Sequence, residues 1–97
     1  MPDIPQVLNL INLAKGSAPS SQVPGTHLEV LVLSSSQDIT VEKALWMLVL
    51  EGEVIIDLPF GDFRVLKLGD SLHLPVGLKI KVQALEEAVV LRQSATG

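Results

Sequence analysis

The chain has 97 residues, no cysteine, 47% hydrophobic residues and a formal net charge of -4. This length allows one domain, and the lack of cysteine excludes disulfides, thiolate metal sites and a cysteine nucleophile. Seven Lys and Arg residues are too few to neutralise nucleic-acid phosphates. The longest apolar run, residues 44–50, is much shorter than the roughly 20 residues of a membrane-spanning helix. The N-terminus lacks the pattern of a signal peptide. We therefore expect a cytoplasmic domain with neither nucleic acid nor a membrane as partner.

The first 25 residues differ in character from the rest. Apolar residues between Ile4 and Ile11 recur at helical spacing, and Asp3 is a candidate helix cap, but residues 7–13 are also acceptable as a strand. We expect a short helix or turn followed by an extended segment. Residues 15–25 are rich in Ser, Pro and Gly, which predicts a loop.

From Thr26 onward the pattern predicts β-strands. Short runs of Val, Ile and Leu alternate with turn signals every eight or nine residues, as in an antiparallel sandwich or barrel. These intervals leave no room for helical crossovers, which excludes a parallel α/β sheet. The expected strands are residues 27–33, 39–41, 44–50, 54–58, 63–68, 71–74, 78–83 and 88–93. The expected turns are Glu51-Gly52, Gly61-Asp62, Gly69-Asp70, residues 75–77 and Glu86-Glu87.

Two of these strands have no polar face. Residues 78–83 alternate apolar and polar side chains, whereas residues 44–50 and 88–91 are apolar on both faces. Something must cover the second apolar face, either the N-terminal segment or another subunit. If Leu45 faces the interior, Trp46 and Leu48 point outward. Buried Trp is frequent at interfaces, so we expect these two residues to lie under the N-terminal segment or in a homodimer interface.

Two turn motifs resemble those of the cupin superfamily. Residues 69–77, GDSLHLPVG, fit the second cupin motif as far as Gly, five residues and Pro-x-Gly, and residues 48–54, LVLEGEV, look like the end of the first motif. The resemblance covers roughly residues 26–93. It implies an all-β fold, a small double-stranded β-helix or jelly-roll barrel. Residues 1–25 would then be an N-terminal extension and loop, and residues 26–97 the barrel.

Most cupins bind a divalent transition metal through a His-x-His pair, a Glu and a third His. The resemblance places the histidine pair on Ile39 and Val41, the glutamate on Leu45 and the third histidine on Ile80. A longer spacer moves the pair to Asp38 and Thr40, where a single carboxylate remains. Aliphatic side chains have no donor atoms, and one carboxylate cannot hold a transition metal. We therefore expect a dry barrel mouth with no metal and no cofactor.

Other candidates for chemistry are few. The histidines His27 and His73 are interpreted as packing or surface residues, although together with Asp38 they are candidates for an unconventional metal site. Arg64, if it faces the interior, would be an anion anchor. No catalytic carboxylate pair is identified, and no Ser-His-Asp order or Gly-rich phosphate loop is present.

Three functional hypotheses remain. The preferred one is a metal-free, non-catalytic homodimer that acts as a binding or structural module. The second is a sensor-like protein whose aliphatic cavity binds a small apolar or weakly acidic ligand, which a cavity of about 300 Å³ or more would favour. The third is a metal-dependent cupin enzyme with unconventional ligands. The residues predicted to line the cavity are Ile39, Val41, Leu45, Met47, His73 and Ile80.

Overall fold

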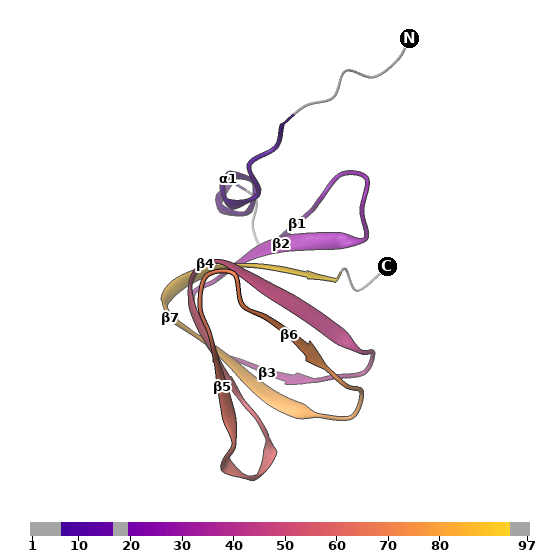
Figure 1. Ribbon diagram of the computed structural model, residues 1–97, viewed down its shortest axis with the longest axis vertical. Coiled ribbons are helices and arrows are strands. Elements are labelled where there is room, and N and C mark those ends of the chain that lie inside the picture. The colour runs from indigo at the N-terminus through magenta and orange to yellow at the C-terminus, as the bar shows by residue number, and fades with distance from the viewer. Residues whose placement is uncertain (1–6, 17–19, 94–97) are drawn as a thin grey trace.

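The computed structural model describes residues 7–16 and 20–93 (Figure 1). Its elements are α1 (Leu10–Lys15), β1 (Ser20–Gln22), β2 (Leu28–Leu33), β3 (Gln37–Thr40), β4 (Leu45–Asp57), the 3-10 turn η1 (Pro59–Gly61), β5 (Phe63–Leu66), β6 (Ser71–Leu74) and β7 (Lys79–Gln93). All strand pairs are antiparallel. No helix within these described ranges is long and apolar enough to span a membrane.

The long strands β4 and β7 organise the barrel. They pair with each other from Met47, opposite Arg92, to Asp57, opposite Lys81. On its other edge, β4 pairs with β6 in its first half and with β5 in its second half. Strand β7 likewise pairs first with β3 and then with β2. The sheet therefore curves around a common interior (Figure 1). The predicted all-β barrel is confirmed.

Two of the predicted turns are instead irregularities inside the long strands. The β4–β7 register shifts between Val49 and Glu53, and Gly52 has a φ of 81°. On the opposite strand Glu86 has a φ of 64°. Some β-bulges, like some tight turns, contain a residue with positive φ, so the two share sequence signals. A bulge bends a strand but does not end it. The predicted turns at Glu51-Gly52 and Glu86-Glu87 are therefore wrong, because β4 continues through the first place and β7 through the second.

The barrel interior is filled by aliphatic side chains. In β4 the inward positions are Leu45, Met47 and Val49 before the bulge, and Val54 and Ile56 after it. Val49, Val54 and Ile56 have no exposed surface. Burial of each such side chain stabilises the fold by about 1.5–3 kcal/mol.

The N-terminal segment differs in detail from the expectation. The helix begins after Asn9, whose side chain accepts a hydrogen bond of 3.0 Å from the backbone N–H of Asn12. Such a bond satisfies one of the free N–H groups of the first turn. The expected cap, Asp3, lies outside the described residues. Within the predicted loop, Ser20–Gln22 forms β1 and pairs with β2, so the sheet begins before residue 26.

Helix α1 covers part of the outer face of the barrel. Ala14 is 1% exposed and belongs to a second apolar cluster with Val30, Val89 and Leu91. The outward row of Trp46, Leu48 and Leu50 packs against this cluster. An ion pair of 2.7 Å between Lys15 Nζ and Glu51 Oε2 joins the end of the helix to β4. The hydrogen bond with Glu51 raises the pKa of Lys15. Trp46 and Leu48 therefore pack against the same apolar cluster as Ala14 of helix α1 and stay partly exposed.

Candidate ligand-binding pocket

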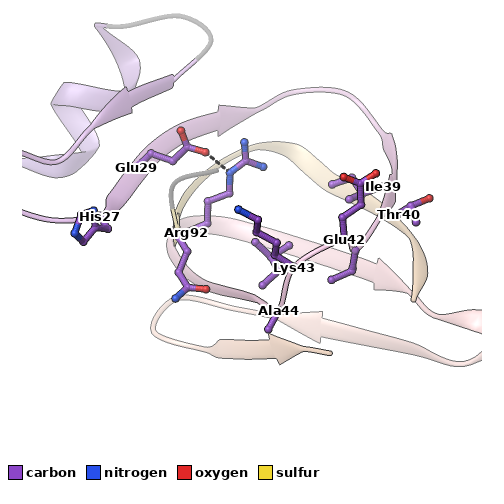
Figure 2. Close-up of a pocket in the computed structure, with 11 residues that line it drawn as sticks. His27, Glu29, Ile39, Thr40, Glu42, Lys43, Ala44 and Arg92 are labelled. Carbon is purple, nitrogen blue, oxygen red and sulfur yellow. Dashed lines mark hydrogen bonds and ion pairs between the residues drawn. The ribbon is translucent and has the colours of Figure 1, made fainter. Parts of the chain in front are cut away.

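A pocket of about 500 Å³ opens at one end of the barrel, where β2 and β4 begin and β3 and β7 end (Figure 2). Ligand pockets typically measure about 300–1,000 Å³. The loop between β3 and β4 forms one side of its rim. The residues that line it are His27, Glu29, Ile39, Thr40, Val41, Glu42, Lys43, Ala44, Leu45, Arg92 and Gln93.

The apolar wall consists of three predicted cavity residues. Ile39 and Leu45 are partly buried and pack against the barrel core, and Val41 is 3% exposed. Val41 is held by two backbone hydrogen bonds of 2.8 Å, in which its N–H donates to the Leu78 carbonyl and its carbonyl accepts from the Gly77 N–H. The wall is therefore fixed to the Pro-x-Gly turn and presents no polar side-chain atom.

The other predicted cavity residues lie elsewhere. Met47 is 3% exposed, one inward position deeper along β4 than Leu45. Ile80 stands opposite Ile39 in the β3–β7 register and lines a shallower pocket of about 410 Å³. His73 is exposed, because Leu72 and Leu74 on either side of it pack against the core and alternation turns it outward, opposite Trp46. His73 is therefore not part of either pocket.

The positions that carry metal ligands in most cupins are unsuited to a metal here. Ile39, Val41, Leu45 and Ile80 are hydrocarbon side chains in or against the barrel core, and they offer no nitrogen or oxygen. The unconventional set is not assembled either, since His27 lines the first pocket, Asp38 the second and His73 neither. Across residues 7–16 and 20–93, no three His, Cys, Asp or Glu side chains are grouped to hold a metal ion.

An ion pair inside the pocket was not found from the sequence. Arg92 Nε lies 2.6 Å from Glu29 Oε1, and the two side chains are 28% and 15% exposed. Glu29 Oε2 also accepts a hydrogen bond of 3.3 Å from the Ser20 hydroxyl. Each oxygen of this carboxylate therefore accepts one hydrogen bond. Figure 2 shows the pair on one side of the pocket and Glu42, Thr40 and Ile39 on the other side.

Strand alternation explains why this pair faces inward. Glu29 shares a face of β2 with the buried Leu31 and Leu33, and Arg92 shares a face of β7 with the buried Val90. The sequence therefore did indicate that both charged residues face inward, because each lies two residues from an inward-facing apolar residue of its strand. Their pairing depended on the β2–β7 register, which places Glu29 opposite Arg92.

Arg64 does not line this pocket. Its guanidinium is half exposed and donates from Nη1 to Asp62 Oδ1 and to the Phe63 carbonyl, both at 2.8 Å. The side-chain hydrogen bond from Arg64 lowers the pKa of Asp62, and the Phe63 N–H adds to this effect. The proposed inward anion anchor at Arg64 is thus replaced by a local surface pair.

Comparison with known proteins identifies the fold. No protein-family model matches the sequence, and no curated protein does. Among solved structures, protein NMB1881 from Neisseria meningitidis matches with a TM-score of 0.74 at 12% identity, over 93% of this chain and 100% of that one. Hydroquinone 1,2-dioxygenase from Sphingomonas sp. TTNP3, with 4-hydroxybenzoate bound, also gives 0.74, at 19% identity over 89% of this chain and 71% of that one.

A third similarity carries the family name. A protein from Shewanella frigidimarina that contains a cupin-2 domain matches with a TM-score of 0.64 at 16% identity, over 74% of this chain and 72% of that one. These identities are low, so the similarity concerns the path of the backbone. It agrees with the turn motifs at residues 48–54 and 69–77. The chain has the fold of the cupin superfamily.

Proposed function

We propose that the protein is a metal-free, non-catalytic barrel of the cytoplasm that binds a small organic molecule in the pocket of Figure 2. The observation that carries the proposal is a pocket of about 500 Å³ in which an aliphatic wall faces a fixed ion pair. Binding sites for small molecules combine a mostly apolar wall with a few placed polar groups in this way. A purely structural module would not need such a pocket, and the ligand-binding hypothesis is therefore favoured.

The chemistry of the lining supports binding without catalysis. Both carboxylate oxygens of Glu29 accept hydrogen bonds, from Ser20 and Arg92, so this carboxylate holds the Arg92 guanidinium in place. Lewis-acid chemistry needs several grouped donor side chains to hold the metal, and among the described residues no three His, Cys, Asp or Glu side chains are grouped in this way. The lining is suited to holding a molecule in one orientation.

Ligand binding is tested by NMR titration of the ¹⁵N-labelled protein with a set of small ring compounds. The set includes 4-hydroxybenzoate, which the structurally similar dioxygenase binds, and its uncharged amide. We expect at least one compound to shift the amide resonances of residues 39–45 and 92, with a Kd of about 1 mM or tighter, as for ligands of about ten non-hydrogen atoms. Ala44→Trp, which fills the pocket from its exposed rim, should abolish these shifts. Unchanged pocket resonances throughout the set would contradict the proposal.

The metal-free state is tested by elemental analysis. Protein purified without added metal, and protein desalted after incubation with excess Mn²⁺, Fe²⁺, Ni²⁺ or Zn²⁺, should both contain much less than one transition-metal ion per chain. The reason is that three or four convergent donors are needed, whereas Leu45 and Ile80 occupy two of the usual ligand positions. Stoichiometric metal in either sample would be incompatible with this part of the proposal.

A homodimer stays a prediction. The row of Trp46 and Leu48 that suggested it packs against an apolar cluster of the same chain that includes Ala14 of helix α1 and remains partly exposed. Sedimentation of the wild-type protein at micromolar concentration tests the dimer directly, and a monomer would contradict it.

A further inference from the structure

The guanidinium of Arg92 is only partly used by its partner. An arginine side chain has five N–H donors, and the bond to Glu29 Oε1 involves Nε alone. Figure 2 shows the two Nη atoms pointing away from Glu29. Arg92 lines the pocket with 28% of its side chain exposed. The outer edge of the guanidinium, which carries a pair of parallel N–H groups, is therefore turned away from Glu29 on a side chain that lines the pocket.

An ion pair at this place is poorly explained by stability alone. Moving two charges to a partly buried site loses hydration energy that their attraction does not always restore, and well-packed apolar residues often stabilise as much or more. The neighbouring inward positions, Leu31 and Val90, are aliphatic. Glu29 balances the charge of Arg92 in the free protein and holds its planar group in one orientation, in which a bound anion would meet the Nη edge.

We infer that the pocket selects molecules that carry a carboxylate, and that Arg92 binds this carboxylate through its two Nη atoms while Glu29 holds Nε. The inference rests on the proposed function and names its ligand class. Two parallel N–H donors match the two oxygens of a carboxylate, and charge-assisted pairs of this kind are about twice as strong as neutral hydrogen bonds.

The rest of the lining determines how such a molecule would lie. Ile39, Val41 and Leu45 offer the apolar wall for its hydrocarbon part. Glu42 and Thr40 lie across the pocket from Arg92 (Figure 2). A carboxylate is therefore attracted at one end of the pocket and repelled at the other, which fixes the acidic end of the molecule at Arg92.

The test compares 4-hydroxybenzoate with 4-hydroxybenzamide, which has nearly the same shape and no charge. In the wild-type protein we expect the acid to bind at least tenfold more tightly than the amide, measured by NMR titration at low salt. Arg92→Met should remove this preference and leave the Kd of the amide within about twofold. Because Arg92→Met leaves Glu29 unpaired, the double variant E29Q/R92M is also measured, with an uncharged pair in the same place. The preference should be absent there too.

Two matched controls make the result specific. Glu29→Gln keeps the guanidinium and removes its competing charge, so acid binding should be equal to the wild type or tighter. Arg64→Met removes an arginine that is also paired with a carboxylate, Asp62, but lies outside the pocket, and the preference for the acid should persist. Equal binding of acid and amide by the wild type, or a preference that survives in E29Q/R92M, would overturn the inference and leave the proposed function intact. Failure of both compounds and of the wider set to bind would instead refute the proposed function.

Discussion

Replacing Gly52 with alanine is expected to lower the free energy of unfolding by about 2–5 kcal/mol. Gly52 has a φ of +81°, a region that costs an L-residue about 1–2 kcal/mol. In addition, an added Cβ would lie 2.6 Å from the Glu87 carbonyl oxygen and 3.0 Å from Ala88 Cα. These are backbone atoms of the partner strand, so relief requires β4 and β7 to separate, a displacement worth about 1–3 kcal/mol. Urea denaturation followed by circular dichroism measures the change.

Gly69→Ala is the matched control for this experiment. Gly69 has a similar φ of +86°, but nothing lies within 4 Å of the added Cβ. Its replacement should cost only the backbone term, about 1–2 kcal/mol. The difference between the two variants therefore measures the close approach of the strands at the bulge. If G52A and G69A lowered the free energy of unfolding equally, the close approach of β4 and β7 would not be a reason for glycine at position 52.

The barrel could be predicted because its signals are local. Alternation of apolar and polar side chains and regular turn spacing depend on neighbouring residues, and they indicate an antiparallel barrel without knowledge of any pairing. The bulges could not be distinguished from turns by such signals. Glu51-Gly52 and Glu86-Glu87 end no strand because β4 and β7 pair with each other on both sides of them, from Met47 opposite Arg92 to Asp57 opposite Lys81.

The candidate site was predictable to a similar extent. Ile39, Val41 and Leu45 were reached through the resemblance of the two turn motifs to those of cupins, which implies that these positions lie on the barrel wall. The pair of Glu29 and Arg92 joins residues that are 63 positions apart, and only the strand register reveals that they meet. His73 illustrates the opposite error. It was included among the cavity residues, whereas alternation with Leu72 and Leu74 turns it outward.

Replacing Ala14 with lysine is expected to detach helix α1 from the barrel. Ala14 is 1% exposed, at the contact between the helix and the outer apolar cluster. A charged ammonium group cannot remain there without losing its hydration, which costs several kcal/mol. A helix of six residues has little stability without its packing, so the helix should separate while the barrel core stays folded. The single tryptophan, Trp46, would then gain exposure to water, and its fluorescence emission should move to longer wavelength with stronger quenching by acrylamide.

The control is Asn12→Lys, which adds the same charge to an exposed position of the same helix. The emission of Trp46 should remain that of the wild type there. In A14K the uncovered row of Trp46, Leu48 and Leu50 forms an apolar patch of the kind that promotes association. The sedimentation coefficient of A14K should therefore rise with protein concentration more steeply than that of N12K or the wild type. Unchanged emission and sedimentation in A14K would mean that helix α1 is not what shields this face of the barrel from water.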